Sequence, residues 1–551
     1  MGKLLYWCNA HVPTAIHYFW QSPHAQQKDE SHQKKLLRKD YLLRTAKAAM
    51  PTSTAAIDKN NWLQKRARDI TKRSCSSVQM QQTLTELQPQ SKYSYDDKGN
   101  GELFADVYSH VARYNTTVNE WFVYNGTVWQ KDVGAMAVSR MAKQLKDELL
   151  VYSISIKNED QQKLYQKHIF KLGSRAVRDT MLKDARDKHP ISNKDLDSNR
   201  DLFNCLNGTL NLKTFEFRDH DPADLISKIA NVKYAPGVRS ALWENFIYTV
   251  MQGNLDKIWY LQKVCGYGIT ADTSQEECYI LYGATTRNGK TTLMEALMNM
   301  LGGSSGYALQ MKPDSLAQKQ NIDSRQANGD IARLAGARFL NVSEPSKRMI
   351  FDSSLLKSLL GRDSIVARHL HEREFEFIPE FKLFLNTNYL PLIQDDNLFS
   401  SGRIKVITFD RHFKEEEQDK TLKDKLRESE NLSGILNWCL EGLRGYTEGL
   451  KPPPDVVAAT AEYRRENDKL GKFIAECLEE AEENITANST YQVYEQWCKA
   501  CGYGCEKRGN FFAELRSKNM LSKSGTVKGI TKLRVIKGYR FSEDWRPLFS
   551  A

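Results

Sequence analysis

The chain has 551 residues and a formal net charge of +11, with 40% hydrophobic and 27% charged residues. This length exceeds what one hydrophobic core usually organises, so we expect a globular protein of several domains. The sequence contains no run of 18 apolar residues, which excludes a membrane span. The positive charge favours a polyanionic partner, although ordinary solvation also explains a modest excess over this length. Ten scattered cysteines indicate reduced thiols and a cytoplasmic location.

Residues 1–90 are predicted to form a basic helical region. The segment 32–44 places apolar residues at helical spacing with cations between them, a pattern that an amphipathic surface helix would also show. Pro89 and the polar run 96–101 then loosen the chain, so we expect a new domain to begin near residue 91.

Residues 91–235 are predicted to form an α+β domain. Residues that favour strands flank Asn125-Gly126 and again Asn207-Gly208, and each dipeptide predicts a hairpin turn. Helical patterns run over residues 136–151 and 161–186 between the two turns.

Residues 236–450 are predicted to form an α/β domain. A helical stretch over residues 241–268 leads into an apolar strand that begins at Cys278. Strands and helices alternate from there on, which is typical of a mostly parallel sheet covered on both faces.

A Gly/Thr-rich loop follows this strand and opens a helix that runs through Met300. The backbone N–H groups of such a loop and the positive end of the helix dipole surround a polyphosphate. In the pattern that ends Gly-Lys-[Ser/Thr], Lys290 reaches the β- and γ-phosphates of ATP and Thr291 holds Mg²⁺ through its hydroxyl. Ala284 takes the place of the leading glycine, and a chance Gly-Lys-Thr at a helix start is the alternative. The predicted nucleotide-binding residues are Gly283, Ala284, Thr285, Thr286, Arg287, Asn288, Gly289, Lys290, Thr291 and Thr292.

Three later positions complete the expected hydrolysis site. Glu344 follows an apolar strand and is expected to polarise the attacking water or to hold the metal's water shell, so Thr291 and Glu344 are the metal candidates. Asn388 ends another strand and would contact the γ-phosphate. Arg403 begins a further strand and is the candidate arginine finger for a nucleotide held by a neighbouring subunit. The predicted catalytic residues are therefore Lys290, Glu344, Asn388 and Arg403.

Residues 364–377 alternate apolar and polar side chains at both ends of a charged centre, which predicts a hairpin. Its cations would contact nucleic-acid phosphates without sequence preference. Glu372 and Glu374 oppose these cations, so a solvated charged turn is the alternative. The predicted DNA-binding residues of this hairpin are Arg368, His369, His371 and Arg373.

The remaining residues are predicted to form a linker and a small basic domain. Residues 451–487 begin with a stiff run of prolines and continue as a helix from Asp455 to about Ala481. Residues 488–551 are predicted to form a winged-helix-like DNA-binding domain with two helices and a hairpin-like tail. The density of cations there favours nucleic-acid contact over a solvated face. The candidate contacts are Lys507, Arg508, Arg516, Lys518 and Lys528, with Lys523 and Arg534 close in the sequence.

These motifs, in this order, resemble the superfamily 3 helicases of viruses and phages. The resemblance is strongest to the helicase part of the primase-helicases of phages, plasmids and satellite islands, which is similar to the poxvirus primase-helicase. Many relatives carry two arginines before the isoleucine, whereas this chain has Gly402-Arg403, so only Arg403 can take the finger role. The matching motifs are Thr-Arg-Asn-Gly-Lys-Thr at 286–291, Ser-Glu at 343–344, Leu-Leu-Gly-Arg-Asp at 359–363, Asn-Thr-Asn at 386–388 and Gly-Arg-Ile at 402–404.

The resemblance implies a multidomain α/β fold with helical and α+β N-terminal domains, an AAA+-like parallel-sheet superfamily 3 helicase motor and a C-terminal winged helix. The motor would use ATP and Mg²⁺, form a homo-hexamer and act on single-stranded and forked DNA, with the hairpin of residues 364–377 in the central channel. Residues 1–90 resemble the helical tail of a primase-polymerase domain, which would lie upstream or in a separate protein. A phage or mobile element would place the protein in the bacterial cytoplasm.

Two classes of function stay open at this point. The first is an ATP-dependent replicative helicase that unwinds duplex DNA as a ring, and the second is an ATP-regulated initiator that assembles on an origin without processive unwinding. Arg403 discriminates between them, because a finger that acts in trans implies coupled hydrolysis around a ring. A small-molecule kinase would explain neither the basic tail nor the hairpin.

Overall fold

The computed structural model describes Phe19 and residues 76–545, except residues 319–328 and 369–373 and the single positions 348, 394, 448 and 528. Most of the basic helical region expected over residues 1–90 lies outside this described part. No helix in the described part is long and apolar enough to cross a membrane.

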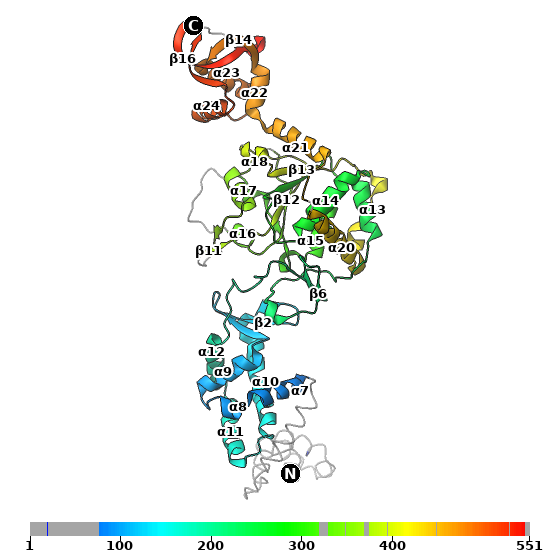
Figure 1. Cartoon of the computed structure of the whole chain (residues 1–551), viewed down its shortest axis with the longest axis vertical. Coiled ribbons are helices and arrows are strands. Elements are labelled where there is room, and N and C mark those ends of the chain that lie inside the picture. Colours follow the sequence, from blue (N-terminus) through cyan, green and yellow to red (C-terminus); the bar gives the residue numbers. More distant parts are fainter. Residues whose placement is uncertain are drawn as a thin grey trace, which may run out of the picture. The chain divides into compact units, whose positions relative to one another are not determined.

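The chain divides into two compact units, and each is considered by itself. One consists of residues 1–123 with 131–193, and the other of residues 124–130 with 194–551. Figure 1 colours both by position in the sequence.

The first unit is mostly helical and has its own apolar core. Phe104, Trp121 and Leu145 lie in that core and are at most 4% exposed. The helical run expected over 161–186 is two helices, because Ser174 adopts an extended conformation between them. The elements of this part are α7 (Ser76–Leu87), α8 (Pro89–Lys92), α9 (Asp97–Tyr108), β1 (Ala112–Asn115), β2 (Glu120–Tyr124), η1 (Val133–Ala135), α10 (Met136–Ser153), α11 (Glu159–Lys171), α12 (Arg175–Asp184) and η2 (Ala185–Asp187). The strand β3 (Trp129–Lys131) belongs mostly to the second unit.

Both expected hairpin turns are confirmed. The side-chain oxygen of Asn125 accepts hydrogen bonds from the backbone of Thr127 and Val128, both at 2.9 Å, between β2 and β3. The second turn, at Asn207, joins β4 (Leu202–Cys205) to β5 (Gly208–Asn211), which pair antiparallel. β6 (Phe217–Arg218) extends this small sheet and is followed by η3 (Pro222–Asp224).

The domain expected at residues 91–235 is divided in the structure, because β4 and β5 belong to the second unit. Phe203 of β4 stacks on Tyr307 with ring centroids 4.8 Å apart. The guanidinium of Arg338 also donates a hydrogen bond to the carbonyl of Leu202, at 2.7 Å. Burial of apolar side chains against the larger core therefore outweighs the sequence proximity of β4 to the first unit.

A five-stranded sheet forms the centre of the second unit, with the strand order β13-β7-β12-β9-β8. Every neighbouring pair of strands is parallel, as the alternation of strands and helices predicts. The strands are β7 (Cys278–Tyr282), β8 (Ala308–Met311), β9 (Phe339–Ser343), β12 (Lys382–Thr387) and β13 (Ile404–Thr408).

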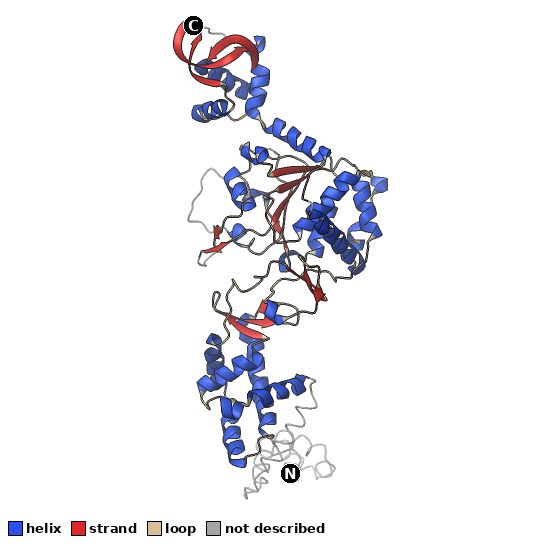
Figure 2. Cartoon of the chain, viewed as in Figure 1, coloured by secondary structure: helices blue, strands red, loops and turns tan. Residues whose placement is uncertain are grey.

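Helices cover both faces of this sheet (Figure 2). Successive side chains of a strand point to opposite faces, so each strand contributes side chains to two cores. Tyr279 and Leu281 of β7 enter one core, whereas Cys278 and Ile280 enter the other. The helices on the first side are α13 (Ala241–Val250), α14 (Leu255–Gly268), α15 (Lys290–Met300) and α20 (Ser429–Tyr446). The shorter elements around the sheet are η4 (Gly303–Ser305), η5 (Pro313–Ser315), α16 (Gly329–Ala332), α17 (Ser353–Leu360), α18 (Asn397–Ser400), η6 (Glu415–Glu417) and α19 (Leu422–Lys425).

The helix α21 (Pro454–Asn467) packs on the sheet and is not a free linker. The backbone N–H of Val406 in β13 donates to the hydroxyl of Thr460, at 3.0 Å, so α21 occupies the hydrogen-bonding edge of the sheet. Tyr463 is 2% exposed and lies in the core of that face. Pro454 begins the helix, where a missing N–H costs nothing.

The prediction of a single helix from Asp455 to about Ala481 is wrong. It breaks at Asp468, and the chain continues as α22 (Lys469–Cys477) and β14 (Leu478–Thr486). β14 pairs antiparallel with β16, so the small domain begins before residue 488. Its other elements are α23 (Ala487–Ala500), α24 (Arg508–Ser517), β15 (Leu521–Val527), β16 (Ile530–Phe541) and η7 (Glu543–Trp545).

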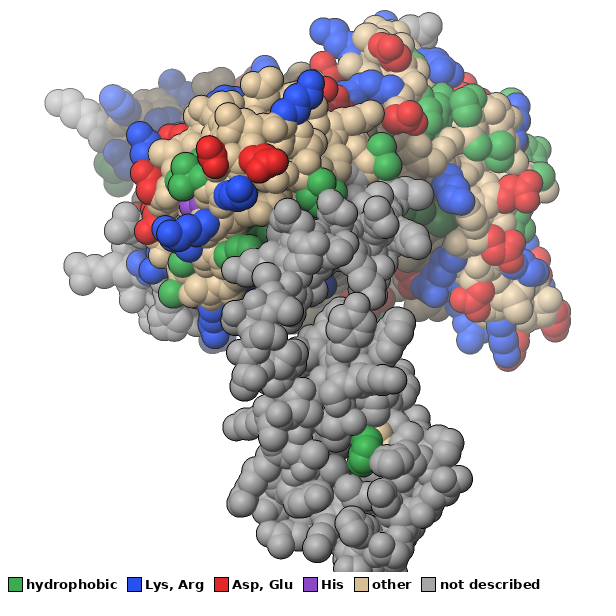
Figure 3. Space-filling model, turned by 90° about the horizontal axis from the view of Figure 1, so that it is seen from below, with side chains coloured by type: hydrophobic (Ala, Val, Ile, Leu, Met, Phe, Trp, Pro, Cys, Tyr) green, Lys and Arg blue, Asp and Glu red, His purple; other side chains and the backbone are tan. Residues whose placement is uncertain are grey.

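The surface of the described residues carries charges of both signs. On the face drawn in Figure 3, Lys and Arg side chains lie among Asp and Glu side chains. The whole-chain charge of +11 therefore does not by itself locate a nucleic-acid surface on this face.

Candidate functional site

The loop between β7 and α15 folds tightly at the carboxyl edge of the sheet. Gly289 has φ +86°, and a Cβ at this position would come within 2.6 Å of Val250. A Cβ at Gly283 would come within 2.1 Å of the Asn288 amide. Both glycines are therefore required by close packing, whereas the exposed positions from Ala284 to Arg287 leave the outside of the loop open.

Lys290 is the first residue of α15, and its ammonium group lies inside this loop. The Nζ atom donates to the side-chain oxygens of Asn288 at 2.9 Å and of Asn388 at 2.7 Å. Burial lowers the pKa of Lys290 to about 8, and the negative charge of Glu344 opposes that shift. A buried ammonium bonded to neutral amides is a site that an anion would stabilise.

The predicted residues of three strands meet at this edge. Asn388 follows β12 directly, at the strand tip where it was expected, and its side chain accepts a hydrogen bond from Lys290. Glu344 follows β9, and its backbone N–H donates to the carbonyl of Asn386 at 2.9 Å. Glu344 has φ +54°, a conformation that costs a non-glycine residue free energy and that recurs at functional sites.

Asn386 also lies at this site, although it is not among the residues predicted from the sequence. It is buried in β12, and its amide nitrogen lies 3.5 Å from the hydroxyl oxygen of Thr291. The alternation along β12 gives the signal, because Phe384 and Asn386 share the face that α15 covers. A buried amide on an otherwise apolar strand indicates a polar partner.

A second contact set that the sequence did not reveal holds the loop from outside. The backbone N–H of Phe413 donates to the carbonyl of Arg287 at 2.9 Å. The Nδ1 atom of His412 donates to the carbonyl of Thr286 at 2.8 Å. The segment after β13 therefore fixes the loop conformation, but no spacing pattern predicts such backbone contacts.

A cleft of about 710 Å³ adjoins Thr291. Its floor is made of side chains that can donate and accept hydrogen bonds, and the Oδ1 atom of Asn341 has no partner there among the described residues. The lining residues from the strands are Gln310, Asn341, Ser343 and Asn386, and those from α15 include Thr291 and Glu295.

Arg403 lies at the opposite edge of the sheet from the loop. The register pairs Ile404 with Cys278 and Thr408 with Tyr282, so the length of the strand, about 15 Å, separates Arg403 from the loop that follows Tyr282. Its guanidinium forms an ion pair with Glu276. Arg403 therefore cannot serve the phosphate loop of its own chain.

The arms of the expected hairpin form as predicted. β10 (Ile365–Ala367) pairs antiparallel with β11 (Phe375–Phe377). Arg368 directly follows β10, whereas the candidates His369, His371 and Arg373 lie outside the described residues.

The candidate cations of the small domain gather around α24. Lys507 precedes the helix, and Arg508 and Arg516 lie in its first and last turns, all three exposed. Arg508 donates to the side chain of Asn488 at 2.5 Å, and Lys518 pairs with Asp468 at 2.9 Å. Lys523 and Arg534 are exposed on β15 and β16, and Lys528 lies outside the described residues.

The oxygen donors at the loop suit Mg²⁺ with a polyphosphate. The described residues contain no group of three His, Cys, Asp or Glu side chains that could hold a metal by themselves. Mg²⁺ commonly takes one or two protein oxygens and completes its shell with phosphate and water. The Thr291 hydroxyl and the Glu344 carboxylate offer such oxygens beside a buried cation that favours an anion.

The fold and this edge define a multidomain α/β protein with a parallel sheet and a glycine-rich loop at its carboxyl edge. Two family models match parts of the chain: "D5 N terminal like" over residues 101–252 and "Poxvirus D5 protein-like" over residues 465–547. The expected resemblance to primase-helicases is thereby confirmed. The second match begins near Asp468, in agreement with a small domain that includes α22 and β14.

Relatives from large DNA viruses match about half of the chain. A protein of Acanthamoeba polyphaga mimivirus named as a helicase is 29% identical over 333 residues, which cover 56% of this chain and 34% of the relative. A protein of frog virus 3 named as a helicase is 26% identical, over 50% of this chain and 28% of the relative. A protein of African swine fever virus named as a primase is 22% identical, over 55% and 34%. The chain thus spans about a third of the length of the curated relatives it matches.

Among solved structures, the C-terminal region of NrS-1 is similar, with a TM-score of 0.40 and 9% sequence identity. The match covers 80% of this chain and 100% of that chain.

Proposed function

We propose that the chain is the motor part of an ATP-dependent DNA helicase of the primase-helicase type. The observation that carries the proposal is the contact of Lys290 with Asn388, 2.7 Å apart, at the edge where Glu344 also lies. A buried cation at a helix start, an amide at a strand tip and a carboxylate at the next tip are the groups that hydrolysis of a phosphoanhydride requires.

Each of these groups has a role in phosphoryl transfer. The backbone N–H groups of the loop and the Lys290 ammonium would hold the phosphates. Asn388 would exchange its hydrogen bond with Lys290 for a contact with the γ-phosphate. Glu344 would orient the attacking water and draw its proton. Bound Mg²⁺, held by Thr291, would offset the phosphate charge.

The motor would act as a ring, with six subunits as the resemblance suggests. Arg403 supports this proposal, because it lies about one strand length from its own loop and would complete the site of an adjacent subunit. Glu276 would release Arg403 at modest cost, since the two side chains of this ion pair, 27% and 28% exposed, still reach solvent that screens their attraction.

The sheet would be of the AAA+-like superfamily 3 type, and the small domain would be a winged helix. Its order, α22-β14-α23-α24-β15-β16, supports this assignment, with α24 as the helix that enters a groove and β15–β16 as the wing. The exposed cations of α24 would then contact DNA phosphates. The hairpin β10–β11 would contact single-stranded DNA through residues 368–373.

Single-stranded and forked DNA would be the substrates, and a primase-polymerase domain or protein would be a partner. Viral relatives named as primases favour such a partner. A phage or mobile-element origin, and hence a bacterial cytoplasmic location, stays a prediction.

One experiment tests the proposal and its alternative, the ATP-regulated initiator. We expect ATP turnover to rise with single-stranded DNA and a forked duplex to be unwound when ATP and Mg²⁺ are present. Turnover that DNA stimulates without strand separation would favour the initiator. The absence of ATP turnover would contradict both.

A further inference from the structure

Side chains in the last turn of α21 form hydrogen bonds to a chain segment between Asn388 and Arg403, two residues of the proposed hydrolysis site. That segment, residues 389–396 apart from position 394, runs from Asn388 toward Arg403. Asn388 contacts Lys290 at one end, and at the other end the backbone N–H of Arg403 donates to the carbonyl of Leu398, at 3.1 Å. The segment therefore connects Asn388 to α18, whose Leu398 holds the backbone of the candidate finger.

Three side chains of α21 hold this segment. The hydroxyl of Tyr463 donates to the carbonyl of Pro391 at 2.5 Å. The Asn467 side chain accepts from the backbone N–H of Ile393 at 3.1 Å and donates to the carbonyl of the same residue. An amide that pairs with both backbone groups of one residue fixes both the position and the direction of the segment.

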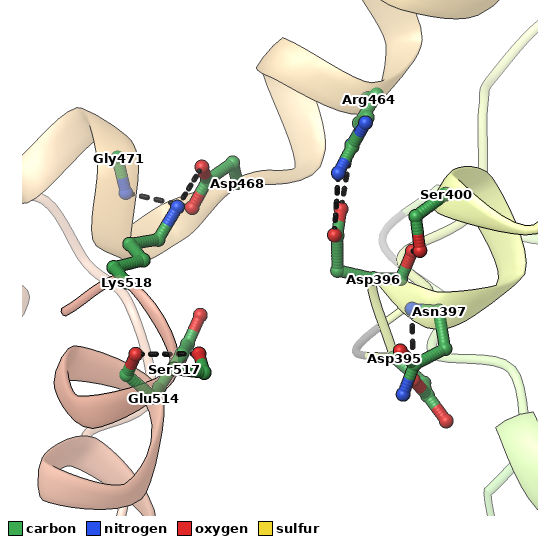
Figure 4. A network of polar contacts seen from close by, with 10 residues as sticks. All are labelled: Asp395, Asp396, Asn397, Ser400, Arg464, Asp468, Gly471, Glu514, Ser517 and Lys518. Carbon is green, nitrogen blue, oxygen red and sulfur yellow. Dashed lines mark hydrogen bonds and ion pairs between the residues drawn. The ribbon is translucent and has the colours of Figure 1, made fainter.

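The third contact is a two-pronged ion pair. The Nε and Nη2 atoms of Arg464 donate to the two carboxylate oxygens of Asp396, at 2.7 and 2.6 Å. Figure 4 shows this pair beside α18, with Ser400 and Asn397 nearby. Both side chains are about half exposed, so the pair adds little to stability, but its fork geometry restricts orientation.

The same helix end leads directly into the small domain. Asp468 leaves the helical conformation and accepts a hydrogen bond from the backbone N–H of Gly471 at 2.7 Å, which caps α22. Its carboxylate also pairs with Lys518, at the end of α24, and Figure 4 shows both contacts. Asn467, which holds Ile393, and Asp468, which caps the first helix of the candidate DNA-binding domain, are therefore consecutive residues.

We propose that Arg464 and Asn467 are positioning residues that couple DNA binding by the small domain to ATP turnover. This inference rests on the proposed function. A displacement of α22 and α24 on DNA would rotate the last turn of α21 and, through Asp396 and Ile393, shift Asn388 and Arg403. Coupling of this kind travels through packed and hydrogen-bonded elements that connect two sites.

The test uses the full chain and compares Arg464→Ala with Arg465→Ala. Arg465 is the adjacent residue and pairs with Glu462 of its own helix, so it is a matched control. In Arg464→Ala we expect basal ATP turnover within about twofold of the unmodified protein and unchanged DNA affinity, because the lost pair is exposed. Stimulation of turnover by single-stranded DNA should be lost in this variant and retained in Arg465→Ala.

A charge exchange separates coupling from structural damage. Arg464→Asp combined with Asp396→Arg should recover a large part of the stimulation that each single change removes, as a direct pair interaction requires. Stimulation in Arg464→Ala equal to that of the unmodified protein would overturn the inference and leave the proposed function intact. If Arg464→Ala loses both basal turnover and thermal stability, the inference is also overturned, because Arg464 would then be required for folding. An unmodified protein without DNA-stimulated turnover would contradict the proposed function itself.

Discussion

At the scale of single residues, the buried charge of Lys290 is unfavourable in the free chain but suits a bound anion. Lys290 is 3% exposed and bonds to amides, so its charge is poorly compensated in the free chain. A polyphosphate would supply the missing negative charge. The burial that lowers its pKa therefore prepares the residue for an anion.

The first prediction concerns this lysine and the carboxylate opposite. Lys290→Ala should abolish ATP turnover by removing charge stabilisation at the β/γ bridge, whereas Glu344→Gln should keep nucleotide binding and stop hydrolysis. Nucleotide titration and phosphate release measure the two effects separately. Turnover in Lys290→Ala equal to that of the unmodified protein would falsify the assignment.

A second prediction follows from the pKa of Lys290, which burial lowers to about 8 in the free chain. Bound phosphates would raise that pKa again, so nucleotide binding must take up a proton once the free lysine has lost it. Affinity should be constant well below about pH 8 and should fall above it, by up to about tenfold per pH unit.

Calorimetric titration with ATP at several pH values measures this dependence. The residual binding of Lys290→Met should show no such decline, because methionine does not titrate. An affinity of the unmodified protein that stays constant to about pH 9.5 would contradict the lowered pKa.

At the scale of elements, the sequence predicted those features that depend on residues close to one another in the chain. The Asn125 and Asn207 turns form because an asparagine side chain satisfies nearby backbone groups or because glycine follows it, and both causes are visible in the sequence. The parallel sheet, the loop after β7 and the place of Asn388 at a strand tip also followed from the order of strands and helices in the sequence. The contacts of His412 and Phe413 with the loop were not predicted, because they depend on how segments distant in the sequence come together.

Two elements show why the remainder was not predictable. Residues 478–486 are rich in glutamate and form β14 only because β16 offers a partner, since strand formation depends on context. The prolines before α21 indicated a linker, and a helical pattern does not say which domain the helix packs against. Thr460 bonds to the edge strand β13 and Tyr463 packs in the apolar core of the sheet. The Thr460 contact spans more than fifty positions, and no local pattern encodes it.

A third prediction concerns the small domain as an element. A chain that ends at Asp468 should keep basal ATP turnover, because α21 stays on the sheet, and should bind duplex DNA more weakly with a shallower salt dependence. A chain that ends at Thr486 keeps residues 478–486 but loses their partner strand β16, which exposes apolar side chains of the small-domain core. It should therefore aggregate, whereas the shorter chain should not. Filter binding at several salt concentrations gives the slope, and an unchanged slope in the shorter chain would remove the DNA-contact role of this domain.

At the scale of the whole molecule, the proposed hydrolysis site needs residues from two edges of the sheet. The loop, Asn388 and Glu344 lie at the carboxyl edge of the sheet, whereas Arg403 lies at the other edge. The proposed ring would bring the two edges of adjacent subunits together. Hydrolysis should therefore depend on assembly, and the rate per subunit should rise with protein concentration until the ring is complete.

The measurement that tests this account most directly mixes two inactive variants. Arg403→Ala keeps the loop and loses the finger, with an expected loss of turnover on the order of 10³-fold and little change in nucleotide affinity. Lys290→Ala loses the loop cation and keeps the finger. In a mixed ring, some interfaces would combine an intact loop from one subunit with an intact finger from the next, so the mixture should hydrolyse ATP faster than either variant alone. If a tagged pull-down shows that the subunits exchange and the mixture is still no faster than its parents, Arg403 does not act in trans and the ring motor is contradicted.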